Sequence, residues 1–292
     1  MTEGFLLVDK EGGWTSHDVV AKCRGILGER KIGHAGTLDP MATGLLVLGV
    51  GRATRLLRYV QGGAKRYEAR VAFGIATDTL DAEGAILERE PMNFASEELS
   101  TVAARFVGAI SQVPPMVSAV KVGGKRLYEL ARQGIDVERE PRTVQIHGIE
   151  VLDVTPGPYP QAEIVVRCGS GTYIRTLADD LARALGGRAH LAALRRTAIG
   201  RHDVDGAFTV AALEALDEPV TALLSMADGL GELGSAVVDA DTAVGVSNGV
   251  IFAAAAFGAE EPGSYRVVGK DGTLLAVYSS DGRSAKPEVV VA

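Results

Sequence analysis

The feature that most constrains this chain is a glycine-rich loop, residues 33–44, followed at once by an apolar run, residues 45–50. Glycines at both ends and in the middle of the loop permit positive φ angles or close approach of another backbone. Pro40 restricts Asp39 to an extended conformation. The apolar run has the length and composition of a fully buried strand. We therefore predict a fixed loop that presents the Asp39 carboxylate beside the core.

These residues alone leave a purely structural interpretation open. Asp before Pro is common in ordinary turns, and one histidine, His34, near one aspartate does not define a site. A phosphate-binding P-loop is excluded, because the loop lacks the Gly-Lys-Ser/Thr ending that such loops need.

The loop and its flanks resemble a known family. Residues 31–47 resemble the catalytic signature of the TruB family of tRNA pseudouridine synthases, and residues 7–20 resemble its other N-terminal motif. Further signatures follow in order, so that the resemblance covers about residues 4–202. It implies that Asp39 is the nucleophile and that His34 fills the space vacated by a flipped-out nucleotide.

Residues 65–74 alternate like a strand, with Tyr67, Ala69, Val71 and Phe73 on one face. By pattern alone, Tyr67 is a core tyrosine. The resemblance implies instead that its ring stacks on the target uracil, which is worth about 1 to 3 kcal/mol for an extruded base.

Residues 165–187 have the order strand, glycine turn and helix, with Thr172 as the candidate cap. Tyr173 and Arg175 fall off the apolar stripe, near the helix start. The resemblance implies that Arg175 pairs with the nucleophilic carboxylate, where its charge would lower the carboxyl pKa. It also implies that Tyr173 contacts the base and is a candidate acceptor for the C5 proton, with water as the alternative. Leu194, by the same resemblance, packs beside the uracil.

The net charge of −7 is unevenly distributed. Residues 203–292 hold 4 Lys/Arg against 14 Asp/Glu, whereas residues 1–202 hold 26 against 23. Because phosphate neutralisation is local, a basic cleft in an acidic protein can still bind RNA. Within a segment that resembles the family's RNA-cleft segment, Lys121, Lys125 and Arg126 are candidate phosphate contacts. Solvated loop charges are the alternative.

Two cysteines without metal-type spacing are typical of a protein from a reducing compartment. The N-terminus lacks the basic region of a signal peptide, and no apolar run reaches membrane-spanning length. We expect a cytoplasmic protein that does not engage a membrane, works as a monomer and has no obligate protein partner.

The sequence predicts an α+β fold of two domains. Residues 1–225 would form the catalytic domain, with a mixed, mainly antiparallel sheet and flanking helices. Residues 226–292 contain short β-type runs and would form a small β-barrel-like domain, similar to the PUA-type domain that family members often carry. The net charge of −10 over residues 203–292 argues against strong RNA contact by this domain.

The resemblance implies an enzyme that converts uridine to pseudouridine in the T loop of tRNA, at uridine-55, without a metal or organic cofactor. Asp39 could attack C6 of the ring or C1′ of the ribose. One alternative is a non-catalytic tRNA-binding or chaperone module with the same fold. Another is a metal-dependent hydrolase using His17, His34 and Asp39, which is weaker because no His pair has ligand spacing and no second carboxylate is expected near Asp39.

Overall fold

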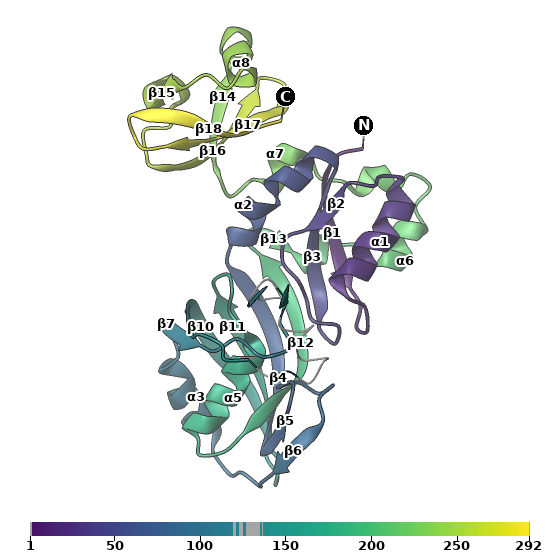
Figure 1. Cartoon of the computed structure of the whole chain (residues 1–292), viewed down its shortest axis with the longest axis vertical. Coiled ribbons are helices and arrows are strands. Elements are labelled where there is room, and N and C mark those ends of the chain that lie inside the picture. Colours follow the sequence, from purple (N-terminus) through teal and green to yellow (C-terminus); the bar gives the residue numbers. More distant parts are fainter. Residues whose placement is uncertain (1, 119–120, 123–124, 127–134, 136, 292) are drawn as a thin grey trace.

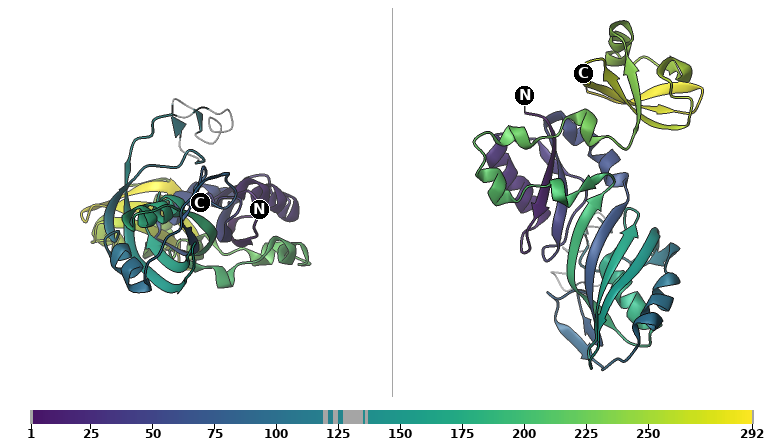
Figure 2. Two further views of the ribbon diagram at one scale, coloured as in Figure 1. Left: turned by 90° about the horizontal axis from the view of Figure 1, so that it is seen from below. Right: turned by 180° about the vertical axis from the view of Figure 1, so that it is seen from behind.

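The structure is a computed structural model, and it describes residues 2–118, 121–122, 125–126, 135 and 137–291. The molecule is elongated, with a small sheet at one end and both termini at that same end (Figures 1 and 2). None of the helices in the described ranges is long and apolar enough to cross a bilayer.

A large twisted sheet forms the body of the molecule. Its strands are β1 (Gly4–Lys10), β2 (Ile32–His34), β3 (Thr43–Val50), β4 (Lys65–Phe73), β7 (Gly108–Gln112), β10 (Arg142–Thr155), β11 (Gln161–Cys168), β12 (Ala189–Ile199) and β13 (His202–Asp203). The order is β1-β3-β12-β4-β11-β10-β7, with β2 paired to β3 and β13 to β12. Among these described strands the β3–β12 pair is parallel and the others are antiparallel. The predicted mixed, mainly antiparallel sheet is confirmed.

Helices cover the sheet and enclose its main core. The longer ones are α1 (Ser16–Leu27), α3 (Ser96–Ala104) and α5 (Ile174–Ala184). Helix α5 packs on β12 and α3 packs on β10, while α1 lies against β2 (Figure 1). Buried apolar side chains from all three helices join those of β1, β3, β4 and β11 in one cluster.

Shorter elements connect these parts. They are η1 (Gly51–Leu56), α2 (Leu57–Gly62), the hairpin β5 (Ile75–Thr77) and β6 (Ile86–Arg89), the pair β8 (Lys121–Val122) and β9 (Lys125–Arg126), η2 (Val204–Gly206), α6 (Val210–Glu214), η3 (Pro219–Ala222) and α7 (Met226–Gly229). The predicted hairpin turn at residues 123–124 lies outside the described residues.

At two helix starts, neighbouring residues compete for the N-cap position. Thr15, not Ser16, caps α1: its hydroxyl accepts from the backbone N–H of Asp18, and the Asp18 carboxylate accepts from the backbone N–H of Thr15. Similarly, Tyr173 rather than Thr172 is the N-cap of α5. Thr15 and Ser16 both satisfy the capping rules, whereas Tyr173 makes no side-chain cap hydrogen bond, so the predicted cap at Thr172 is wrong.

The C-terminal segment forms a second, smaller sheet. Its elements are β14 (Gly234–Val238), α8 (Ala240–Ser247), β15 (Phe252–Ala253), η4 (Ala254–Phe257), β16 (Gly263–Gly269), β17 (Leu274–Ser280) and β18 (Ser284–Val290). The strand order is β14-β16-β17-β18-β15. Tyr278 packs among Phe252 and Phe257 in its core. The expected β-rich C-terminal unit is thereby confirmed.

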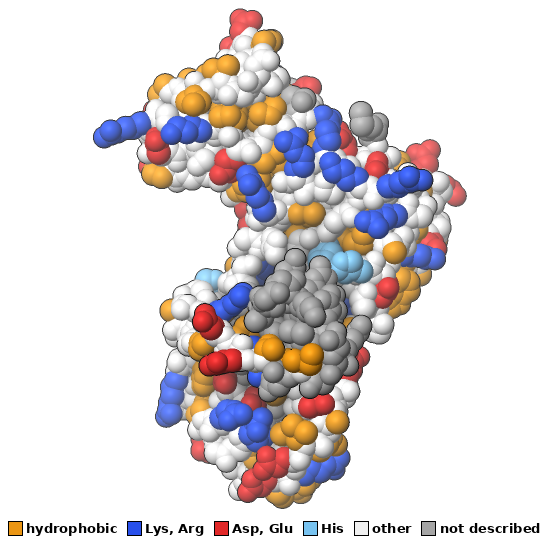
Figure 3. All heavy atoms as spheres, viewed as in Figure 1, with side chains coloured by type: hydrophobic (Ala, Val, Ile, Leu, Met, Phe, Trp, Pro, Cys, Tyr) orange, Lys and Arg blue, Asp and Glu red, His pale blue; other side chains and the backbone are white. Residues whose placement is uncertain are grey.

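Basic residues of η1 and α2 contact the last residues of the C-terminal sheet. The Arg52 guanidinium donates to the carbonyl of Val291, and Arg55 Nη1 donates to the carbonyl of Val290 at 2.8 Å. Figure 3 shows Lys and Arg side chains gathered on the face where α2 meets the C-terminal sheet. Part of the positive charge of residues 1–202 is therefore engaged in holding the C-terminal sheet.

Candidate active site

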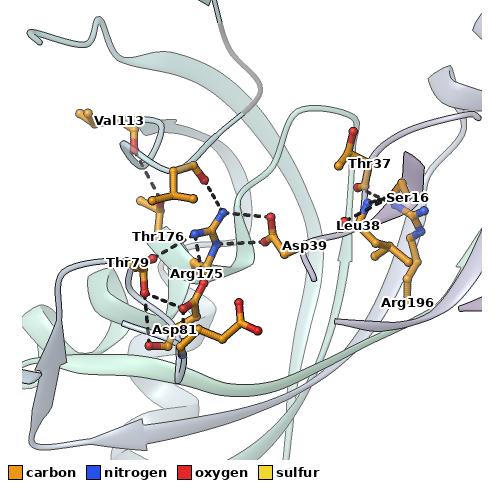
Figure 4. Close-up of polar contacts among 12 residues, drawn as sticks. Ser16, Thr37, Leu38, Asp39, Thr79, Asp81, Val113, Arg175, Thr176 and Arg196 are labelled. Carbon is orange, nitrogen blue, oxygen red and sulfur yellow. Dashed lines mark hydrogen bonds and ion pairs between the residues drawn. The ribbon is translucent and has the colours of Figure 1, made fainter. Parts of the chain in front are cut away.

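Asp39 lies in the loop between β2 and β3 and forms a two-point ion pair with Arg175 from the first turn of α5. Arg175 Nε lies 3.0 Å from one carboxylate oxygen, and Nη2 lies 3.1 Å from the other (Figure 4). The Asp39 side chain is 33% exposed and that of Arg175 only 3%. Such a fork-to-fork pair fixes the carboxylate in orientation as well as in place.

The same guanidinium is held from behind by a second carboxylate. Arg175 Nη1 donates to Asp81 at 3.1 Å and to the carbonyl of Thr79 at 3.0 Å, while Nη2 also donates to the carbonyl of Val117 at 2.7 Å (Figure 4). The expectation that no second carboxylate lies near Asp39 is therefore wrong. Asp81 is almost fully buried and completes a chain Asp39–Arg175–Asp81.

Asp81 comes from residues 75–90, whose turn-rich sequence gives no sign of a role in the site. The residue before it, Leu80, has a φ of 61°, the left-handed conformation that non-glycine residues rarely adopt. Strain of this kind persists where the surrounding structure requires it, often at functional sites. The backbone conformation that aims Asp81 at Arg175 could not be predicted from local sequence.

The surroundings of Asp39 shift its acidity in two directions. Burial raises the pKa of Asp39 above the ordinary value, the Arg175 guanidinium lowers it, and the Asp81 charge raises it again. The contribution expected from Arg175 is present, but burial is the larger cause and the net direction is upward. Asp39 is thus a partly desolvated carboxylate with a fixed geometry, a combination found at catalytic positions.

Three buried side chains hold the Asp39 loop by its backbone. Ser16 Oγ accepts from the N–H of Leu38 at 2.9 Å and lies 3.3 Å from the Leu38 carbonyl. Lys10 Nζ donates to the carbonyl of Pro40 at 3.1 Å. Asp39 therefore sits between two residues that are each anchored to another element.

Arg196 from β12 is the third anchor. Its Nη2 donates to the carbonyl of Gly36 at 3.1 Å, and its Nε donates to the carbonyl of Leu45 at 2.8 Å. Gly44 has a φ of 99°, and a Cβ there would collide with the backbone of Arg196. This close approach explains why glycine is needed where the loop enters β3.

A cavity of about 250 Å³ opens beside the ion pair. The predicted site residues Asp39, Tyr67, Tyr173, Arg175 and Leu194 all line it. Tyr67 lies on the buried face of β4, as the strand alternation predicts, and Leu194 projects from the neighbouring strand β12. The structure thus brings an aromatic ring, an aliphatic side chain and an ionised pair to the wall of one cavity.

Tyr173 is held by a residue that the sequence analysis did not single out. The buried amide of Gln112 accepts from the Tyr173 N–H at 3.0 Å and donates to the Tyr173 carbonyl at 3.2 Å. Burial raises the pKa of the Tyr173 phenol, so the hydroxyl is protonated at neutral pH.

Four predicted residues are not placed in the cavity. His34 ends β2 and meets His17 edge to face with ring centroids 5.5 Å apart, but it is not among the cavity-lining residues. Burial lowers the His34 pKa, which leaves the ring neutral. The side chains of Lys121, Lys125 and Arg126 lie outside the described structure, which gives only the backbone pairing of β8 with β9.

The sequence analysis did not identify two further cations that line the cavity, Lys65 and Arg196. A signal for both exists, because Lys65 shares the inward face of β4 with Tyr67, and Arg196 is two residues after Leu194 on β12. Within the described ranges, no group of three or more His, Cys, Asp or Glu side chains is arranged to hold a metal ion.

Comparison with known proteins bears on this arrangement. The family model described as "TruB family pseudouridylate synthase (N terminal domain)" matches residues 24–174. That described as "tRNA pseudouridylate synthase B C-terminal domain" matches residues 175–244. The chain is 49% identical over 249 residues to a protein of Symbiobacterium thermophilum named tRNA pseudouridine synthase B, covering 85% of this chain and 82% of that protein.

A second relative with the same name, from an Arthrobacter species, is 42% identical over 302 residues, an alignment that covers 100% of this chain and 97% of that protein. Among solved structures, the one titled "Crystal Structure of a Cbf5-Nop10-Gar1 Complex" superposes with a TM-score of 0.77 at 25% identity, over 99% of this chain and 85% of that one. Fold, cavity and relatives together define the class: a pseudouridine synthase, an isomerase with an α+β fold. The chain belongs to the TruB family.

Proposed function

We propose that this protein converts a uridine of tRNA to pseudouridine in the T loop, at position 55, with Asp39 as the nucleophile. The observation that carries the assignment of Asp39 is its two-point pair with Arg175 at the wall of a cavity shared with Tyr67 and Leu194. The relatives named tRNA pseudouridine synthase B support tRNA as the substrate.

The reaction needs a carboxylate, a fixed base and a place for one proton. The N1–C1′ bond breaks, the detached uracil turns over, and a C5–C1′ bond forms, with no redox change and no net hydrolysis. Asp39, held by Arg175, would attack C6 of the ring or C1′ of the ribose and be released intact at the end. The flipped base would be retained between the Tyr67 ring and Leu194 while it is detached.

The C5 proton must leave after the new carbon–carbon bond forms. A phenol whose pKa is raised is a poor proton acceptor at neutral pH, because its reactive form is the phenolate. Tyr173 and a water remain the two candidate acceptors of this proton, and the Tyr173 hydroxyl would also be a hydrogen-bonding partner of the base. Gln112 would fix Tyr173 for this task.

We further propose that the protein acts as a cytoplasmic monomer with two domains, residues 1–225 and 226–292. The C-terminal sheet begins at β14, which supports a boundary before residue 234. Apolar residues of β16, β17 and β18 nevertheless share a cluster with residues of β1 and β3. Limited proteolysis of the full chain tests the boundary, and light scattering tests the oligomeric state.

The function is tested by release of tritium from C5-labelled uridine in a tRNA transcript, in buffer with chelator. The expected result is one equivalent of tritium per tRNA, with pseudouridine mapped to position 55 alone. A transcript with cytidine at that position is the matched control and should release none from the T loop. Tritium release equal in both transcripts would refute the proposed target, and no release from either would refute the activity.

A further inference from the structure

Lys65 is a buried cation at the proposed active site that the chemistry above does not use. It begins β4 two residues before Tyr67, so the two side chains share one face and lie about 6 to 7 Å apart along the strand. Lys65 is 6% exposed and lines the same cavity as Asp39. Its ammonium donates to the carbonyl of Gln61 and to Ser170 Oγ, the latter at 3.2 Å.

The partners of this ammonium are neutral oxygens. Among the described residues Lys65 forms no ion pair, and two of its three N–H donors are used by Gln61 and Ser170. Burial, and after it the charge of Arg196, lower the Lys65 pKa to about 8 against weaker opposing effects of Cys168 and Glu232. A buried cation without a counter-charge is costly, and an incoming anion would offset that cost.

The position of Lys65 indicates which anion. Gln61, Ser170 and Gly171 are exposed residues of the cavity wall, so the ammonium lies just beneath the mouth. A nucleotide extruded into a cavity stays joined to its chain by two phosphates, which must therefore remain at the mouth. Lys65 and Tyr67 thus line one cavity from the same face of β4, with the ammonium toward the mouth.

We propose that Lys65 binds a phosphodiester next to the target uridine and thereby anchors the flipped nucleotide with its base on Tyr67. This inference rests on the proposed function, because it assumes an RNA nucleotide in the cavity. Lys65 would be a substrate-binding residue distinct from Asp39 and Arg175, and its role is to hold the nucleotide rather than to take part in bond changes. The phosphate would accept from the third N–H of the Lys65 ammonium, which Gln61 and Ser170 leave unused.

The test is a double-mutant cycle between protein and RNA. Stem-loop RNAs carry a neutral methylphosphonate at the phosphate 5′ or 3′ of the target uridine, one at a time, and binding and single-turnover rates are measured with wild type and Lys65→Met. In wild type, one of the two substitutions should weaken binding about tenfold, the value of one charge-assisted hydrogen bond. In Lys65→Met the same substitution should cost less than about twofold.

Arg66→Met is the matched control, because Arg66 is the next residue on β4 and points to the opposite face, where it contacts Glu68 and Thr197. Its effect should add to that of each methylphosphonate. Thermal unfolding of Lys65→Met, together with Lys65→Gln as a second neutral variant, separates loss of the contact from loss of folding.

Additive effects of both methylphosphonates with Lys65→Met and with Lys65→Gln would overturn the proposal. This failure is distinguishable from failure of the proposed function, which would appear as the absence of pseudouridine when wild type meets unmodified RNA. Pseudouridine formation together with additive cycles would leave the isomerase standing and make Lys65 a structural residue.

Discussion

The active-site region and the C-terminal sheet are both well packed, but they differ in what they bury. Around the cavity, Lys10, Lys65, Asp81, Arg175 and Arg196 are all less than 7% exposed. In the described residues of the C-terminal sheet, from 234 onward, Ser280 is the buried polar residue and the rest of the core is apolar.

The buried charges around the cavity carry a cost in folding free energy that the C-terminal sheet does not have. Burying charges destabilises a fold unless each is paired and hydrogen-bonded, so a core built only for stability avoids them. Around Asp39 this cost is offset in two ways. Buried cations donate to backbone carbonyls, and Arg175 pairs with both Asp39 and Asp81. Changes there should therefore reduce turnover and stability together, whereas changes in the C-terminal sheet should reduce stability alone.

The largest combined effect is expected from Arg175→Met. It leaves Asp39 and Asp81 without their shared cation, and breaking a buried pair costs about 3 to 5 kcal/mol of unfolding free energy. Single-turnover rates should fall by more than about 1000-fold, because the carboxylate loses both orientation and counter-charge. Urea unfolding and quenched-flow assays measure the two effects. Turnover within tenfold of wild type would contradict the assigned role of the pair.

Asp81→Asn should reduce turnover less, by about 100-fold, through misplacement of Arg175. Its pH profile is the sharper readout. The reaction needs ionised Asp39, whose pKa is raised, so the wild-type rate should fall on acidification at a higher pH than an ordinary aspartate allows. Because the Asp81 charge contributes to that rise, its removal should move the acid limb to lower pH. A limb that stays in place would refute the electrostatic link.

Tyr67→Ala should cost about 1 to 3 kcal/mol in binding of the flipped nucleotide, the value of one stacked base. Tyr67→Phe keeps the ring and is the matched control, so its affinity for a stem-loop RNA should equal that of wild type. Fluorescence of 2-aminopurine placed beside the target uridine reports extrusion directly. Equal extrusion with Tyr67→Ala and Tyr67→Phe would exclude stacking on this ring.

The smallest effect is expected in the C-terminal sheet. Tyr278→Phe removes one buried hydrogen bond, from the hydroxyl to the carbonyl of Val250 at 2.9 Å, and should lower the unfolding free energy by about 0.5 to 1.5 kcal/mol. Single-turnover rates at saturating tRNA should stay within twofold. A large loss of rate without a loss of stability would show that the C-terminal sheet takes part in the chemistry.

The sequence was most informative where local rules act on short segments. Period-two alternation placed Tyr67 on the buried face of β4, and the apolar run after the glycine loop proved to be the buried strand β3. Lys65 follows the same alternation, so its position on the inward face of β4 could have been predicted as well. Ser16 shows the opposite case, because it satisfies the local cap rule but bonds the backbone of Leu38 instead.

What could not be predicted depends on contacts between distant segments. Asp81 reaches Arg175, 94 positions away, through a left-handed Leu80 that no local rule favours. The anchors of the Asp39 loop come from β1, α1 and β12, and their polar ends act on backbone carbonyls that the sequence does not reveal. The upward direction of the Asp39 pKa likewise depends on burial, which exists only in the fold.

The most direct test of the central claim is Asp39→Asn, assayed for pseudouridine and tRNA binding in the same samples. The amide fits the same space, and phosphate contacts supply most of the affinity, so binding should stay within a few fold of wild type. Pseudouridine should be absent after a single turnover at saturating tRNA, because an amide cannot serve as the nucleophile. Substantial pseudouridine from folded, tRNA-bound Asp39→Asn would contradict the account.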